Sequence, residues 1–143
     1  MKKAVLAKTS GEIRVLDVPE NGNLLKWMYG AIGCDMIEIV RARNLKDGLV
    51  LVVDEEGLMK DVPSINLYGS YLYGTLEHGQ PIIGDMLILR EFEGPDGGDL
   101  EGMDDETALE LVRNYEAHEK DWELAITLKF LMARRGMRNV FED

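Results

Sequence analysis

Apolar residues recur along the first 92 residues in short runs that are typical of β-strands. These runs are bounded by turn residues, and each predicts a strand. They lie at residues 4–7, 12–18, 36–42, 49–53, 58–62 and 82–92. The run at 49–53, Leu-Val-Leu-Val-Val, contains no polar position. A strand with one exposed face alternates between apolar and polar residues, so this run predicts a central strand covered on both faces.

One segment in this first part repeats its apolar residues at helical spacing instead. It covers residues 24–33 and predicts a helix of about three turns. Asn21 or Asn23 is suited to cap its first turn, because an asparagine oxygen accepts from exposed helix N–H groups. Gly33 is suited to end it. The stretch from 63 to 84, rich in tyrosine and glycine, predicts a short helical turn with loops.

A second apolar stripe at helical spacing runs from residue 105 to residue 135, with Asp104 as its N-cap. At about 1.5 Å per residue such a helix would span roughly 45 Å, more than the diameter of a small domain. We therefore expect it either to break in two near residues 117–120 or to protrude and pair with a second copy. The second alternative predicts a homo-oligomer held together by the C-terminal helix.

Between the two parts lies an acidic segment. Residues 91–106 carry eight acidic side chains and no basic ones, together with four glycines and a proline. This composition predicts a mobile linker over residues 93–104. The whole chain then forms one α+β domain. Residues 1–92 form a β-rich core, in which one short helix packs on a small mixed or antiparallel sheet, and residues 105–143 form a helical segment.

Charge and cysteine content narrow the classes of function. The net charge is −11, and residues 91–143 alone hold 6 basic and 15 acidic side chains, a net −9. A field of this sign repels nucleic acid, so we expect no direct nucleic-acid binding. No apolar run approaches the length of a membrane span, and the one cysteine, Cys34, cannot form an intrachain disulfide. We therefore expect a cytoplasmic protein. The acidity favours solubility, a surface that mimics DNA, or docking on a basic partner.

Few residues carry the chemistry of catalysis. His78 and His118 are about forty residues apart, and neither has a second histidine or a cysteine at helical spacing. Residues 97–108 fail the calcium-loop template because neither end of the loop is acidic. No phosphate-binding glycine motif is present. We predict no metal site and no cofactor, and binding is favoured over turnover.

One set of residues has the chemistry to hold a nucleotide-like ligand. Its members supply a pair of guanidinium groups for phosphates, aromatic rings for stacking, and an amide and a carboxylate for a base or ribose. They are Arg41, Arg43, Tyr68, Tyr71, Asn66 and Asp54. The simpler alternative is that the arginines lie at the surface and the tyrosines belong to the core.

Several short motifs carry a family resemblance. A strand ends in Val-Asp-Glu-Glu-Gly at 53–57, Asn66 follows nine residues later, and Ile-Ile-Gly-Asp occupies 82–85. Over residues 3–92 the chain resembles a family of proteins of unknown function from phages and mobile elements, although Cys34 stands where a glycine is usual. The resemblance implies a bacterial host and a protein that acts by binding.

Three hypotheses follow. The first is a non-enzymatic phage or mobile-element protein that captures a small nucleotide-like ligand, such as a signal of host immunity. The second is an acidic interaction module that docks on or inhibits a basic host protein. The third, a metal-dependent hydrolase using Asp54, Glu55 and Asp85, lacks a supporting histidine.

Overall fold

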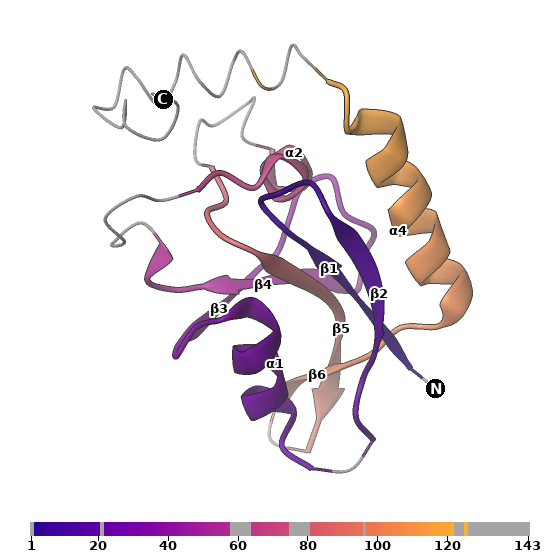
Figure 1. Cartoon of the computed structure of the whole chain (residues 1–143). Coiled ribbons are helices and arrows are strands. Elements are labelled where there is room, and N and C mark those ends of the chain that lie inside the picture. The colour runs from indigo at the N-terminus through magenta and orange to yellow at the C-terminus, as the bar shows by residue number, and fades with distance from the viewer. Residues whose placement is uncertain are drawn as a thin grey trace.

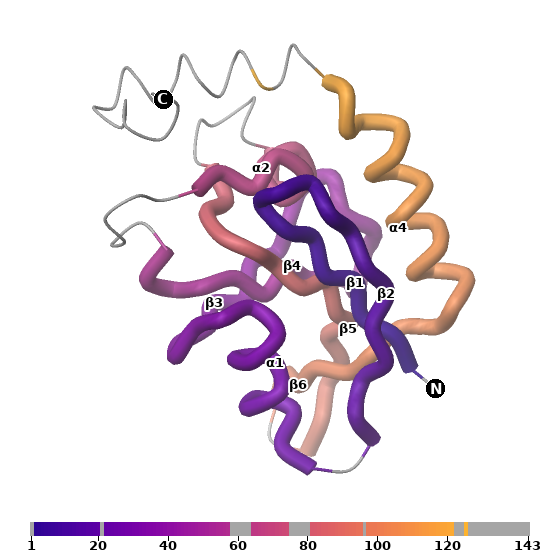
Figure 2. Tube along the Cα trace, viewed as in Figure 1, coloured from indigo at the N-terminus to yellow at the C-terminus, as the bar shows by residue number. Residues whose placement is uncertain are grey.

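A six-stranded antiparallel sheet forms the centre of the protein in the computed structural model, which describes residues 2–20, 22–57, 64–74, 81–95, 97–121 and 125. Its strand order is β2-β1-β5-β4-β3, and β6 pairs with the last part of β5. The strands are β1 (Lys3–Ala7), β2 (Ile13–Asp17), β3 (Ile37–Val40), β4 (Leu49–Asp54), β5 (Met86–Gly94) and β6 (Gly97–Glu101). Figures 1 and 2 show the sheet with helices on both sides.

The two central strands, β4 and β5, are covered on both faces, as the apolar run at 49–53 predicted. Leu51 and Ile88 belong to one cluster of buried side chains, whereas Val52 and Leu87 belong to the other. Neighbouring residues of a strand point to opposite faces, so each apolar run supplies both clusters. The fold is therefore α+β with an antiparallel sheet between two helical layers.

Helix α1 (Leu24–Ile32) covers one face, and its caps are those that the sequence predicted. The Asn23 side chain accepts from the Lys26 N–H at 3.0 Å, which satisfies a free donor of the first turn. Gly33 ends the helix in the left-handed conformation, with φ of 81°.

Two helices cover the other face, α2 (Leu67–Tyr73) and α4 (Asp105–His118). Helix α2 arises where only a short helical turn was expected, so the prediction of one short helix was incomplete. Helix α4 ends at His118, inside the range where a break was expected. The rest of the predicted helix, apart from residues 119–121 and 125, and the predicted strand at 58–62 lie outside the described residues. The oligomer expected from that helix stays a prediction.

The acidic segment 93–104, expected as a mobile linker, is instead largely part of the sheet. β5 continues to Gly94, and β6 returns along it as the second strand of a hairpin. Met103, only 2% exposed, then exchanges two backbone hydrogen bonds of 2.7 Å with Lys3. Glycine in this segment suggested mobility, but Gly97 instead allows the hairpin turn, because its φ of 105° is one that other residues rarely adopt.

None of the helices in the described ranges is both long and apolar enough to cross a membrane.

The start of α4 predicts a specific acid sensitivity. The Asp104 carboxylate accepts from the Thr107 N–H at 2.7 Å, and hydrogen bonding with Thr107 lowers the pKa of that carboxyl. A lowered pKa in the folded state means that this stabilisation is complete above the unfolded pKa of about 4 and is lost as the pH falls through the folded pKa. In Asp104→Asn the amide oxygen keeps the cap but does not titrate.

We expect melting temperature to fall less steeply between about pH 5 and pH 2 in Asp104→Asn than in the wild type. Some acid sensitivity will remain, because Lys3 and Arg14 lower the pKa values of Asp17 and Glu12 respectively. Asp47→Asn, in an exposed loop, is the control. If the melting temperature falls equally steeply with pH in all three proteins, the Asp104 carboxylate is not a source of the acid sensitivity.

Candidate binding site beside the β5–β6 hairpin

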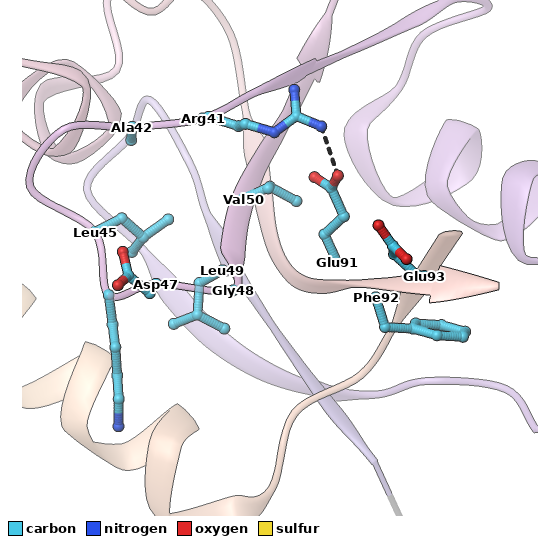
Figure 3. Close-up of a pocket in the computed structure, with 11 residues that line it drawn as sticks. Arg41, Ala42, Leu45, Asp47, Gly48, Leu49, Val50, Glu91, Phe92 and Glu93 are labelled. Atoms are coloured by element: carbon cyan, nitrogen blue, oxygen red, sulfur yellow. Dashed lines mark hydrogen bonds and ion pairs between the residues drawn. The ribbon is translucent and has the colours of Figure 1, made fainter. Parts of the chain in front are cut away.

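A cavity of about 400 Å³ lies where β4 begins and β5 continues past it. Its walls come from the loop at residues 41–48, from the first residues of β4, and from residues 91–93 of β5. Figure 3 shows these side chains around the opening, with Arg41 above and Phe92 opposite Leu49. This volume is within the range of small-ligand sites.

The opening exists because β4 starts late. The Gly48 carbonyl accepts from the Glu91 N–H at 2.8 Å, and beyond this bond no backbone hydrogen bond joins residues 41–48 to residues 92–94. Gly48 has a φ of 88°, a conformation that turns the preceding loop away from β5. β5 then runs on to Gly94 with only β6 beside it among the described strands.

One ion pair dominates the charged wall of the cavity. Arg41 Nη2 lies 2.5 Å from Glu91 Oε1, and the two side chains point toward one another in Figure 3. The Glu91 side chain is 23% exposed against 74% for Arg41, so the carboxylate is the anchored partner. The other oxygen, Glu91 Oε2, is buried and has no hydrogen-bond partner. A buried acceptor without a donor costs roughly 1–3 kcal/mol, so a movement of the Glu91 side chain that brought this oxygen to a donor would be favourable.

The remaining charges around the opening are Lys46, Asp47 and Glu93. With Arg41 and Glu91 they make three carboxylates and two cations. The apolar part of the wall consists of Leu45, Leu49 and Phe92, and Phe92 is 36% exposed. The cavity thus combines a slight negative excess with an apolar floor.

Of the six residues proposed from the sequence, only Arg41 lines this cavity. Arg43 is exposed on the same loop but outside the lining. Asp54 lies at the far end of β4, where its carboxylate accepts from the Glu56 N–H at 2.9 Å and closes the turn.

Asn66 is a structural residue of the core, 1% exposed. Its Oδ1 accepts from the Gly69 N–H at 2.8 Å and caps α2. Its Nδ2 donates to the Ala7 carbonyl at 2.9 Å and to the Gly84 carbonyl at 3.0 Å. Both amide hydrogens are therefore committed to backbone groups.

Tyr68 is also buried, and its hydroxyl donates to the Leu111 carbonyl at 2.9 Å, which joins α2 to α4. Burial raises the pKa of Tyr68, and the charge of Tyr71 adds to this effect. Tyr68 packs edge-to-face on Tyr115, whereas Tyr71 stacks on His118 with ring centroids 4.2 Å apart. Tyr68 and Tyr71 do line one small cavity together, but their rings already have protein partners.

The three acidic residues of the hydrolase hypothesis are only partly brought together. Asp54 lines one cavity of about 180 Å³ together with Asp85 and another together with Glu55, but neither of these two cavities is lined by all three residues. Asp85 accepts from the Thr9 N–H at 2.9 Å. Within the described ranges, no group of three or more His, Cys, Asp or Glu side chains is placed to hold a metal ion.

Sequence reasoning missed Glu91, Phe92 and Glu93 as site residues because they were assigned to a strand end and an acidic linker. A signal was present. Glu91 and Glu93 alternate with Arg90 and Phe92, and this alternation of two kinds of side chain is typical of a strand with two different faces.

Comparison with known proteins establishes the family. No match was found among curated proteins or among solved structures. The sequence model of one family, described as a domain of unknown function (DUF3846), matches residues 1–116. This range includes all six described strands, α1, α2 and most of α4. It supports the expected resemblance to a family of unknown function, whereas the phage origin stays a prediction. The chain belongs to the DUF3846 family.

Proposed function

We propose that this protein is a non-enzymatic interaction module that holds a basic segment of a partner protein against the β5–β6 hairpin. The observation that carries the proposal is the placement of the acidic residues. They lie on two paired strands and at the start of α4, beside a cavity, and not on a mobile linker. An ordered acidic surface presents its charges in fixed positions, which gives both attraction and specificity.

Several of these acidic side chains already make ion pairs or hydrogen bonds within the fold. Glu91 pairs with Arg41, and Glu101 Oε1 lies 3.6 Å from Arg90 Nε. Asp104 caps α4. Glu93 and Asp99, by contrast, are exposed, and the described residues give neither of them an ion pair, although Asp99 Oδ1 accepts from the Leu100 N–H at 2.8 Å. On the hairpin these two carboxylates therefore remain free to pair with a cation of a partner.

The cavity beside the hairpin suits a lysine or arginine side chain of the partner. Such a side chain combines an apolar stem with a cationic end. Glu93 accepts hydrogen bonds from the charged end, while Leu49 and Phe92 provide apolar surface for a neighbouring side chain of the same segment.

Capture of a nucleotide-like ligand stays a prediction, but the geometry favours it less. Among five cavities in the described part of the chain, none is lined by more than two of the six residues proposed for that ligand. A phosphate beside Arg41 would also meet the carboxylates of Glu91 and Glu93, and like charges at short range repel. That the partner is a host protein of a phage or mobile element is an expectation from the family resemblance alone.

A charge-neutralised hairpin tests the proposal. The probe is an eight-residue peptide that alternates lysine and valine, titrated by fluorescence anisotropy in about 50 mM salt. We expect Glu93→Gln/Asp99→Asn to bind roughly fivefold more weakly than the wild type, since exposed charge contacts are each worth up to about 1 kcal/mol. Binding of the wild type should weaken strongly at about 500 mM salt.

The matched control is Glu55→Gln/Glu116→Gln, which removes the same charge from exposed positions outside the hairpin. It should bind almost as tightly as the wild type. A second peptide that alternates glutamate and valine should not bind. Equal weakening in both double variants would show that only net charge matters, and no binding of the lysine peptide to the wild type would end the proposal.

A further inference from the structure

We infer that the partner's basic segment binds in extended form, as an additional β-strand along residues 92–94 of β5, with one lysine or arginine side chain in the cavity. This inference rests on the proposed function and names its binding mode. The structure supports it with an open strand edge, the shape of the cavity, and an alternation of chemistry along that edge.

The edge is open by the geometry of the ladder. In an antiparallel sheet, successive residues direct their N–H and C=O groups to opposite neighbours. The Glu91 N–H bonds to Gly48 on the β4 side, so Phe92 faces β6 and Glu93 faces the β4 side again. β4 begins only at Leu49 and does not reach this position, and no other described strand takes its place. The peptide groups of Glu93 are thus available to an added strand, as in other strand-addition complexes.

The cavity follows this edge and does not lie over one face of the sheet. Glu91, Phe92 and Glu93 all line it, although consecutive side chains of a strand point to opposite faces. Only a cavity at the edge of β5 contacts all three. A bound chain in that position would be flanked by β5 on one side and by the loop at 41–48 on the other (Figure 3).

The two faces at this edge differ in chemistry. Glu91 and Glu93 point to one face, where Glu91 meets Arg41 and leaves Oε2 without a donor. Phe92 points to the other face, the one on which Leu45 and Leu49 are buried. An added strand places alternate side chains on these two faces. The edge therefore selects a segment in which a basic residue alternates with an apolar one.

Hydrogen exchange of single amides tests the binding mode without any mutation. In the free protein, we expect the Glu93 amide to exchange fast, because it faces the open edge, and the Phe92 amide to exchange slowly, because it faces β6. Saturating lysine–valine peptide should slow exchange at Glu93 by at least about tenfold and leave Phe92 nearly unchanged. Strand addition predicts this difference between two neighbouring amides, which charge attraction alone does not.

Two variants at one position provide a second readout. Glu93→Gln removes the charge and keeps the N–H, whereas Glu93→Pro removes both and suits an edge whose N–H is unpaired. We expect the proline variant to bind the peptide at least about fivefold more weakly than the glutamine variant, with circular dichroism confirming that both fold. Peptide binding without protection of the Glu93 amide would overturn the strand-addition mode and leave the proposed function standing. Absence of any peptide binding would overturn both.

Discussion

Replacing Asn66 by alanine is expected to lower the free energy of unfolding by about 3–5 kcal/mol. The buried Asn66 side chain makes three hydrogen bonds, to backbone groups of Ala7, Gly84 and Gly69. Removing one partner of a buried hydrogen bond costs about 1–3 kcal/mol, and three such losses near the lower end of this range give the expected total. The substitution also removes the N-cap of α2. Urea unfolding followed by circular dichroism measures the change, and we expect a melting temperature lower by roughly 10 °C.

Asn44→Ala is the matched control for this substitution. Asn44 is exposed, and its Nδ2 makes one bond, to the Tyr71 carbonyl at 2.9 Å. We expect a loss of about 1 kcal/mol or less. If Asn66→Ala instead unfolds like the wild type but loses affinity for a nucleotide, then Asn66 is a ligand group after all and its structural assignment is wrong.

The parts of the fold that local chemistry determines could be predicted from the sequence. Asn23 and Gly33 end α1 through bonds and dihedral angles within a few residues of the chain, so both caps are visible as residue types. The apolar run at 49–53 indicates a strand that is buried on both faces, because only such a strand needs an apolar residue at every position. The class of the fold follows from such elements.

The site could not be predicted in the same way, because its residues are defined by distant partners. Asn66 bonds to Ala7, 59 residues earlier in the chain, and Tyr68 bonds to Leu111, 43 residues later. A polar or aromatic residue that satisfies buried backbone looks in sequence like one that binds a ligand. The acidic segment misled for a related reason. Its glycines and carboxylates are typical of a linker, and only pairing with β5 makes Gly97–Glu101 a strand.

Gly102 connects this hairpin to the rest of the sheet, and Gly102→Ala is expected to destabilise the protein by about 2–4 kcal/mol. A Cβ atom there would lie 2.6 Å from Lys2 Cβ and 2.9 Å from the Lys3 carbonyl oxygen. Two of the three closest atoms are backbone, so β1 itself must move. That movement disrupts the paired hydrogen bonds between Lys3 and Met103, and overpacking adds strain.

Gly30→Ala is the natural comparison, because apart from the neighbouring backbone of α1 itself no atom lies within 4 Å of the added Cβ. Alanine favours a helix over glycine by up to about 1 kcal/mol, so this variant should be more stable than the wild type, and the two substitutions should have opposite signs. If the ordered hairpin supplies the docking surface, Gly102→Ala should also weaken peptide binding under conditions where it is still folded, whereas Gly30→Ala should not. A Gly102→Ala protein with wild-type stability would show that β1 adjusts freely at Lys2 and Lys3. The connection between hairpin and sheet would then be looser than these distances imply.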